Sequence, residues 1–438
     1  MNDVPLTLPR VFRFWLPLAA TWLMMAVEGP FLAAVIARLP EPTYNLAAYG
    51  VAFSLALVAE APVIMIMSAA TALARNRLSY LRLRTFTHAL NAGVTLAMAV
   101  ALLPPVFDWI ANGLIGLPSD VASRTHTSLL ILLPWPATIG LRRLYQGVLI
   151  RHGLTRRVAY GTIVRLVAMF GTAFVLARHG GIEGAWVGAA ALTMGVSCEA
   201  VASRAMSGAA IRSLLVQTGE ATGAASSYRG LTRFYYPLAL TTLLSLGIHP
   251  VVTFFVGNSR ASLESLAVLP VVGSLIFIFR SLGLAYQEVV IALIGDHHQG
   301  YRVLRRFGVL LAVGVIAGLA LIAWTPLSGI WFRTVSGLSP DLAAFAIAPT
   351  RILALIPGLT VLLSFQRAIL VVRNTTNGIT WATIIEVIGV VAVLWIGISQ
   401  LNAIGAVAAA AALLIGRIGA NLYLVPALRA RGSEGVRE

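Results

Sequence analysis

The chain has 438 residues, of which 58% are hydrophobic and only 11% are charged, and its mean hydropathy is +0.87. These values exclude an ordinary soluble domain. The net charge of +16 comes from arginines in short clusters between apolar runs, without the basic faces or interleaved aromatics of a nucleic-acid-binding protein. All 32 basic residues are Arg, a composition bias that suggests a bacterial source, and the lone Cys198 excludes an intramolecular disulfide.

Apolar runs of twenty or more residues indicate helices that cross roughly 30 Å of hydrocarbon. Twelve spans are predicted, at residues 11–37, 46–74, 84–103, 124–150, 156–178, 182–205, 232–257, 265–294, 303–324, 343–372, 376–399 and 403–427. The first run is too long for a signal peptide and lacks a small-residue cleavage site, so it is predicted to remain as a span. The predicted fold class is therefore an all-α polytopic membrane protein with twelve transmembrane helices.

The segments outside these spans predict the topology. Residues 105–117 and 326–338 align with each other and are expected to form short interfacial helices, with Trp109 and Trp331 as anchors. About twenty arginines fall at one set of span ends and five at the other. By the positive-inside rule, both termini and the polar, Gly/Ser-rich stretch at residues 205–230 are expected to be cytoplasmic.

An internal repeat divides the chain into two halves. "RFWLPLA" from Arg13 matches "RFYYPLA" from Arg233 at an offset of 220, and "GAWVGAAAL" from Gly184 matches "GAVAAAAAL" from Gly405 at 221. This register predicts two homologous six-helix lobes, residues 1–206 and 230–438, with a cytoplasmic linker at 207–229. Because six is even, the lobes are expected to be related by a pseudo-two-fold axis along the membrane normal, around a cavity that opens to alternate sides.

The last predicted span of each half begins with a pattern that resembles a known superfamily. A "G-x-x-G-A" pattern opens the sixth and twelfth spans, at Gly181 to Ala185 and, more loosely, at Asn402 to Ala406. Together with two parallel six-helix halves, it resembles the MATE-like multidrug/oligosaccharidyl-lipid/polysaccharide exporter superfamily. The resemblance implies a transporter.

Four further segments resemble the progressive ankylosis protein family within that superfamily. They are "LAAYGVAFSL" (46–55), "FYYPLAL" (234–240), "WTP" (324–326) and "APTRILALIP" (348–357). The family is implicated in the export of pyrophosphate, nucleotide and citrate-like anions. The resemblance therefore implies an anionic substrate.

Charged residues near the bilayer midplane are the first functional candidates, because an uncompensated charge there is costly. They are Glu60, Arg165, Arg280, Glu386 and Arg417. The repeat aligns Glu60 with Arg280 and Arg165 with Glu386, so each half presents the opposite charge at an equivalent place. One hypothesis is that these residues form interhalf ion pairs that gate transport. The alternative is that they form ordinary buried pairs that fix helix packing.

Arginines are the candidates for binding an anionic substrate, since the planar guanidinium donates two hydrogen bonds to carboxylate or phosphate. Arg165, Arg280, Arg417 and Arg142 are predicted to be substrate-binding residues, and Arg143 and Arg367 lie near them. The alternative for Arg142, Arg143 and Arg367 is snorkelling toward the cytoplasmic headgroups.

Glu28 and His249 are the remaining candidates for ion coupling. They lie just before the aligned Pro30 and Pro250 of the first and seventh spans. A proline-kinked helix can move such a group between environments, and a histidine titrates near neutral pH. The alternative is a packed histidine and a glutamate held by a neighbouring arginine.

Several functions lack the motifs that they need. No Walker loop, H-E-x-x-H or G-x-S-x-G is present, so neither an ATP-driven pump nor a membrane hydrolase is supported; no enzyme activity and no cofactor are expected. "GDHHQG" at residues 295–300 has adjacent histidines, which do not converge on one metal, so no metal site is predicted.

The sequence thus predicts a secondary active exporter of the inner membrane that works by alternating access. Its substrate is predicted to be a small organic or phosphorylated anion, and its driving force a proton, sodium or substrate gradient. Three alternatives remain: a cationic multidrug antiporter, a flippase for a lipid-linked sugar, and a non-transporting scaffold or receptor.

Overall fold

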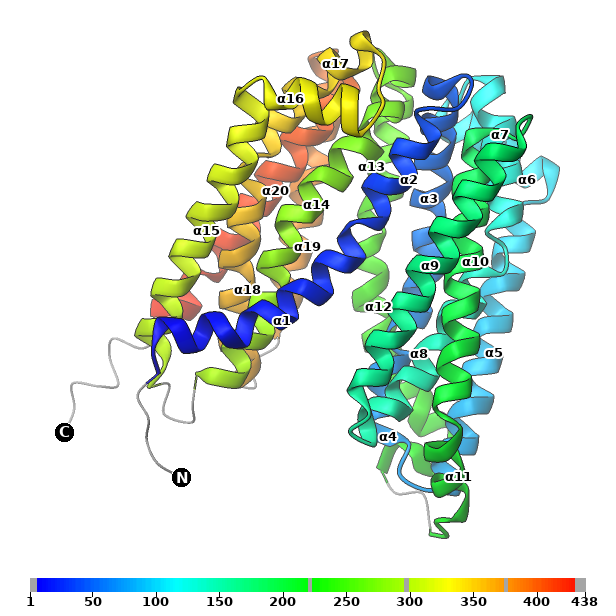
Figure 1. Ribbon diagram of the computed structural model, residues 1–438, viewed down its shortest axis with the longest axis vertical. Coiled ribbons are helices and arrows are strands. Elements are labelled where there is room, and N and C mark those ends of the chain that lie inside the picture. Colours follow the sequence, from blue (N-terminus) through cyan, green and yellow to red (C-terminus); the bar gives the residue numbers. More distant parts are fainter. Residues whose placement is uncertain (1–5, 220–222, 295–298, 374–376, 430–438) are drawn as a thin grey trace. The chain divides into compact units, whose positions relative to one another are not determined.

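The computed structural model describes residues 6–219, 223–294, 299–373 and 377–429. Within these ranges every regular element is a helix (Figure 1). The predicted all-α fold class is confirmed. The adjacent histidines His297 and His298 lie outside the described residues.

Most of the predicted spans are long, apolar helices. Among the described residues, ten helical segments are long and apolar enough to cross a membrane, and the pair Arg77–Ala101 and Pro104–Ile115, bent by 74°, adds an eleventh. The predicted fourth span consists of two helices of 13 and 17 residues, each shorter than the roughly 20 residues typical of a membrane-crossing helix. The chain is therefore polytopic, with fewer uninterrupted apolar spans than the twelve predicted.

The helices form two compact units. Unit 1 contains Met1–Ala34 and Asn258–Glu438, and unit 2 contains Val35–Gly257. The helices of unit 1 are α1 (Leu8–Ala26), α14 (Ser262–Leu293), α15 (Tyr301–Trp324), α16 (Leu327–Gly329), η3 (Ile330–Val335), α17 (Pro340–Leu353), α18 (Ile356–Val372), α19 (Asn377–Leu394), η4 (Trp395–Gln400) and α20 (Gly405–Arg429). Helix α2 (Glu28–Ile36) begins in unit 1 and ends in unit 2.

The helices of unit 2 occupy the middle of the chain. They are α3 (Pro42–Ile64), α4 (Ile66–Leu73), α5 (Arg77–Ala101), α6 (Pro104–Asp108), η1 (Trp109–Ile115), α7 (Ser119–Ile131), α8 (Trp135–Arg151), α9 (Thr155–His179), α10 (Gly184–Met206), α11 (Gly208–Val216), η2 (Gly223–Ser226), α12 (Tyr228–Leu246) and α13 (Ile248–Gly257). The two segments predicted as short helices are helical, as α6 with η1 and α16 with η3.

The packing units differ from the lobes defined by the repeat, because each half places its first span in the unit of the other half. The Trp15 indole on α1 donates to the Leu282 carbonyl on α14 at 3.1 Å. The Tyr235 hydroxyl on α12 donates to the Pro62 carbonyl on α3 at 2.5 Å. Trp15 aligns with Tyr235 and Pro62 with Leu282, both at offset 220, so the exchange is the same contact made twice.

Aromatic packing repeats around these two hydrogen bonds. The Trp15 ring packs edge-on to Phe307 of α15, with centroids 5.8 Å apart. The Tyr235 ring packs edge-on to Phe86 of α5 at 5.3 Å. Because Phe86 and Phe307 are also aligned, at offset 221, the aromatic residue of each "RF" motif serves to anchor the exchanged helix.

The exchanged spans break at prolines deep in the helix. Span 1 is interrupted at Val27 and span 7 at Gly247, three residues before Pro30 and Pro250. A proline lacks the N–H that would bond four residues back, so the helix loses a bond at this point in both halves. By contrast, α1 and α12 continue through their earlier prolines.

The "G-x-x-G-A" segments are held in the same way in both units. In unit 2 the Ala185 N–H donates to the Asn45 side-chain oxygen at 3.0 Å, and in unit 1 the Ala406 N–H donates to the Ser265 hydroxyl at 3.0 Å. Ala185 aligns with Ala406 at offset 221, and Asn45 aligns with Ser265 at offset 220. The signature therefore fixes the start of α10 against α3 and of α20 against α14.

Glycines bring the fifth and sixth spans of each half together. A Cβ on Gly195 of α10 would lie 3.1 Å from the Arg165 carbonyl oxygen on α9, and one on Gly416 of α20 would lie 2.7 Å from the Glu386 carbonyl oxygen on α19. An added Cβ would force a shift at Gly416 and a smaller adjustment of the neighbouring atoms at Gly195, so glycine favours this close approach. Each contact lies at a charged candidate residue.

Candidate functional site

Unit 2 contains a buried charge cluster centred on Glu199. This side chain on α10 is 1% exposed. Its Oε2 accepts a hydrogen bond from Arg142 Nη1 on α8 at 2.6 Å, and its Oε1 accepts one from Gln146 Nε2 at 3.0 Å. Arg165 Nη1 on α9 lies 3.8 Å from Glu199 Oε2. Glu199 therefore connects three helices through charged and polar contacts.

Two more charged residues complete the unit 2 cluster. Glu60 on α3 is buried and interacts electrostatically with Arg142, Arg143 and Arg165. Arg143 on α8 interacts with both Glu60 and Glu199. The cluster thus contains three arginines and two glutamates.

Unit 1 contains a second buried cluster, on α14, α18, α19 and α20. Arg417 Nε donates to Glu386 Oε1 at 2.8 Å, and Arg417 Nη2 lies 2.8 Å from the same oxygen. Arg417 Nη1 also donates to the Thr360 hydroxyl at 3.4 Å. Arg280 on α14 and Arg367 on α18 both interact electrostatically with the Arg417–Glu386 pair. This cluster has three arginines and one glutamate.

The unit 1 cluster has spare hydrogen-bond donors. The Nε atoms of Arg280 and Arg367 are buried and have no hydrogen-bond partner within the described residues. Arg280 forms no ion pair with a described residue, and Arg367 donates only to the Thr383 hydroxyl, at 3.3 Å. A buried donor without an acceptor is costly, so these guanidinium groups favour an incoming acceptor.

The polarity of one helix–helix ion pair is reversed between the units. In unit 2 the arginine is on α9 (Arg165) and the glutamate on α10 (Glu199), whereas in unit 1 the glutamate is on α19 (Glu386) and the arginine on α20 (Arg417). The opposite charges at Arg165 and Glu386 therefore each have a partner within their own unit. The proposed interhalf ion pairs, Arg165 with Glu386 and Glu60 with Arg280, stay predictions.

Some sequence-based interpretations change with this geometry. Arg142 does not snorkel toward the headgroups, because it is 5% exposed and bonded to Glu199. Glu199 was not among the residues predicted to lie nearest the midplane, and it aligns with Ala420, so it has no charged counterpart in the repeat.

The two candidates beside the prolines differ in exposure. Glu28 is the first residue of α2 and is 6% exposed, and its carboxylate at a helix N-terminus is favoured by the helix dipole. His249 is the second residue of α13 and is exposed. Glu28 belongs to unit 1 and His249 to unit 2.

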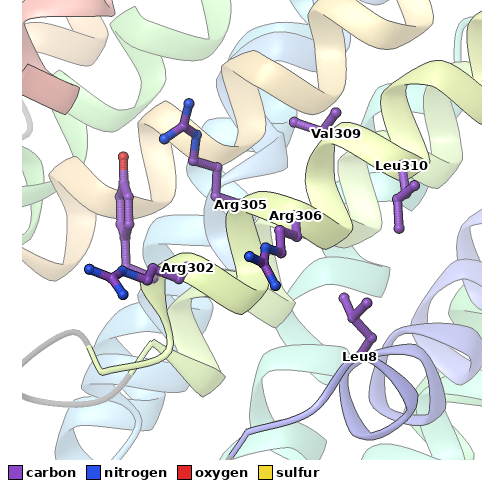
Figure 2. Close-up of a pocket in the computed structure, with 7 residues that line it drawn as sticks. Leu8, Arg302, Arg305, Arg306, Val309 and Leu310 are labelled. Carbon is purple, nitrogen blue, oxygen red and sulfur yellow. The ribbon is translucent and has the colours of Figure 1, made fainter.

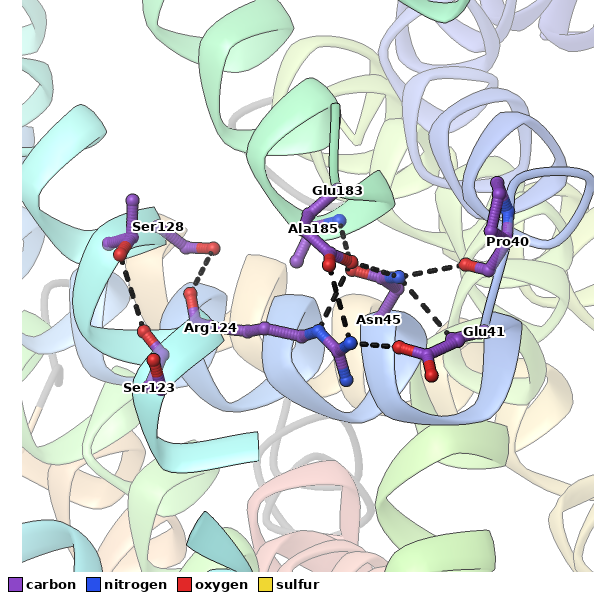
Figure 3. A network of polar contacts seen from close by, with 9 residues as sticks. Pro40, Glu41, Asn45, Ser123, Arg124, Ser128, Glu183 and Ala185 are labelled. Atoms are coloured by element: carbon purple, nitrogen blue, oxygen red, sulfur yellow. Dashed lines mark hydrogen bonds and ion pairs between the residues drawn. The ribbon is translucent and has the colours of Figure 1, made fainter. Parts of the chain in front are cut away.

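A polar network that the sequence did not reveal joins four segments at one end of unit 2 (Figure 3). Arg124 of α7 pairs with Glu41 and with Glu183, the latter at 3.1 Å. Asn45 Nδ2 donates to Glu183 Oε2 at 2.9 Å and to the Pro40 carbonyl at 2.9 Å. Glu183 lies inside the first "G-x-x-G-A" pattern, and its charge is the one feature of the sequence that could have pointed to this network. The network fixes the start of α10.

The fold is shared with known membrane transporters, although no family model and no curated protein matches the sequence. An inward-facing multidrug resistance MATE family transporter of the MOP superfamily matches with a TM-score of 0.63 and 14% identity, over 100% of this chain and 98% of that chain. The lipid II flippase MurJ matches with a TM-score of 0.71 and 14% identity, over 94% and 87%. The chain has the MATE-type fold.

A third structure adds a contrast in pocket chemistry. A MOP superfamily transporter from Pyrococcus furiosus matches with a TM-score of 0.62 and 14% identity, over 98% of this chain and 96% of that chain. Its description states that the reverse polarity of its binding pocket suggests a different function. The predicted superfamily fold is thus supported, while the resemblance to the progressive ankylosis family stays a prediction.

Proposed function

We propose that this protein is a secondary active transporter that exports a small organic or phosphorylated anion by alternating access. The observation that carries the proposal is the arginine excess of the unit 1 cluster, where Glu386 is the one acidic neighbour that Arg280, Arg367 and Arg417 have within the part of the chain that the structure describes. Carboxylate or phosphate oxygens would accept from the spare donors of Arg280 and Arg367. The MATE-type fold supports transport as the activity.

The unit 2 cluster would serve the same substrate less strongly. Its three arginines face Glu60 and Glu199, so its excess positive charge is smaller than that of unit 1. Arg142 and Arg165 are already paired with Glu199 and would contribute mainly through their electric field. The primary anion contacts are therefore assigned to Arg280 and Arg367, and Arg417, which is paired with Glu386, would contribute mainly through its electric field.

Transport would be coupled through buried carboxylates. Glu60 and Glu386 lie inside the arginine clusters and Glu28 lies at the break between α1 and α2. Protonation or sodium binding at one of them would change the charge that the substrate meets, and His249 would provide a further proton site. By the arginine distribution, the protein would reside in the inner membrane with both termini cytoplasmic.

The test is substrate uptake into proteoliposomes that contain the purified chain, with radiolabelled citrate and pyrophosphate as probes. Arg280→Gln should reduce the uptake rate about ten- to a hundred-fold, since a charged hydrogen bond is lost, and Arg280→Lys should retain part of it. Arg84→Gln, an exposed arginine on α5, is the control and should leave uptake unchanged. Uptake that is equal in the wild type and Arg280→Gln would refute the proposal.

The same vesicles identify the coupling ion. An imposed pH or sodium gradient should accelerate uptake by the wild type, and Gln in place of the coupling glutamate should abolish only that acceleration. If neither Glu28→Gln, Glu60→Gln nor Glu386→Gln changes the response to either gradient, coupling through these residues is wrong. Uptake of ethidium in place of the anions would instead favour the cationic multidrug antiporter, which the arginine excess disfavours.

A second candidate is a flippase for a lipid-linked sugar diphosphate. It is favoured by the match to MurJ, described as a lipid II flippase, and by the ability of paired arginines to bind a diphosphate. A fluorescent undecaprenyl diphosphate sugar in the same vesicles distinguishes the candidates. Its translocation without citrate or pyrophosphate uptake would establish the flippase.

A further inference from the structure

A pocket of about 600 Å³ lies at the beginning of α15, and none of its lining residues belongs to either buried cluster (Figure 2). Three of its seven lining residues are arginines: Arg302, Arg305 and Arg306. The rest of the lining consists of Leu8 from the start of α1 together with Tyr301, Val309 and Leu310 from α15. Both helices belong to unit 1.

The arginines of this pocket carry unbalanced charge. All three side chains are exposed. None of them forms a hydrogen bond or ion pair with a residue that the structure describes. Three guanidinium groups within one and a half helical turns repel one another, so an anion that binds between them is favoured.

The apolar part of the pocket continues directly along the same helix face. Val309 and Leu310 follow Arg302 and Arg306 at helical spacing, and they are 56% and 62% exposed. Tyr301 stands at the first position of α15, where an aromatic ring suits a membrane interface. A basic end followed by an exposed apolar wall matches a molecule with an anionic head and a hydrocarbon chain.

At the aligned start of α5 in the other half, one arginine bonds to the chain itself. Helix α5 aligns with α15, and Arg82 near its start donates to the carbonyls of Ala225 and Ser226 in η2. There the linker between the halves supplies the acceptors. No described segment does so at the start of α15, so an external ligand has access to the same kind of surface.

We propose that this pocket binds an anionic phospholipid, with its phosphate between Arg302, Arg305 and Arg306 and an acyl chain along Val309 and Leu310. Clusters of arginine at the cytoplasmic end of a membrane helix bind anionic headgroups. The predicted topology places the start of α15 at that surface. The site is independent of the proposed transport activity, and the phosphate chemistry alone would also accept a soluble phosphate ester.

The test is native mass spectrometry of the purified full chain in detergent, titrated with dioleoyl-phosphatidylglycerol, dioleoyl-phosphatidylcholine or glycerol 3-phosphate. The wild type should bind phosphatidylglycerol in preference to both others. The triple variant R302Q/R305Q/R306Q should bind it about a hundred-fold more weakly. R302K/R305K/R306K keeps the charges and should retain most of the affinity.

A matched control removes the same charge elsewhere. R77Q/R84Q/R156Q neutralises three exposed arginines of unit 2 and should bind phosphatidylglycerol like the wild type. If the triple variant of α15 does not fold, each single Gln variant should still weaken binding about five-fold.

Three outcomes would overturn the proposal. Equal binding of phosphatidylglycerol and phosphatidylcholine would show that charge does not select the ligand. Equal loss of binding in the unit 2 control would show that only total charge matters. Saturable binding of glycerol 3-phosphate that competes with phosphatidylglycerol at similar affinity would assign the pocket to a soluble phosphate ester rather than to a lipid.

Discussion

Removing the charge of Glu199 should strongly destabilise unit 2. Glu199→Gln keeps the side-chain shape, but the Arg142 guanidinium at 2.6 Å and the Arg165 guanidinium at 3.8 Å lose their nearest anion. Both Arg142 and Glu199 are nearly fully buried, so water cannot replace the lost partner. Breaking such a pair from one side costs about 3–5 kcal/mol.

The cost should appear as a lower melting temperature of the purified protein in detergent. For a unit of about 220 residues each kcal/mol corresponds to roughly 2–4 °C, so a shift of about 10 °C is expected. Arg142→Gln combined with Glu199→Gln removes both charges, and the double variant should be more stable than the sum of the two single effects predicts. Glu264→Gln, on an exposed glutamate at the start of α14, is the control.

Two results would refute this reasoning. A Glu199→Gln melting temperature within 2 °C of the Glu264→Gln control would mean that the buried pair contributes little. Strict additivity of the two single variants would mean that Arg142 and Glu199 do not interact in solution. In either case the cluster would not be the interhelix connection that the geometry indicates.

Two further predictions concern contacts that occur in both halves. Gly416→Ala would place a methyl group 2.7 Å from atoms of α19, and Gly195→Ala would place one 3.0 Å from atoms of α9. Both variants should lower the melting temperature, Gly416→Ala more strongly. Gly171→Ala is the control, because its methyl group meets nothing within 4 Å, and it should leave the melting temperature unchanged. Trp15→Phe and Tyr235→Phe each remove one interhelix hydrogen bond, at about 1 kcal/mol, and their effects on melting should add because they fall in different units. A larger loss for Gly171→Ala, or non-additive aromatic variants, would contradict these assignments.

The fold was predictable because its signals are local or periodic. Long apolar runs predict helices directly, and the offsets of 220 and 221 predict two homologous halves, in which the structure shows that some contacts recur at aligned positions. Asn45 with Ala185 and Ser265 with Ala406 are the same hydrogen bond at aligned positions. The broken helices were not predicted in detail, since Pro17 and Pro237 leave α1 and α12 intact while Pro30 lies just beyond a break.

The partners of the candidate residues were much harder to predict. The repeat directed attention to positions where both halves carry a charge, such as Arg165 and Glu386. Their partners Glu199 and Arg417 align with Ala420 and Val196, so no offset connected them to the cluster. An ion pair depends on which helices pack together. Aligning the two halves shows which positions are equivalent, but it does not show which residues touch.

The exchange of the first spans connects the "RF" motif to the charged candidates. Trp15 bonds to the Leu282 carbonyl and Tyr235 to the Pro62 carbonyl, each two residues after a midplane charge, Arg280 or Glu60. A movement of α1 along α14 must therefore break a hydrogen bond or carry along the helical turn that follows Arg280. The same holds for α12 and the turn that follows Glu60. The same hydrogen bond is therefore made in both halves, two residues after a positive charge in one and a negative charge in the other.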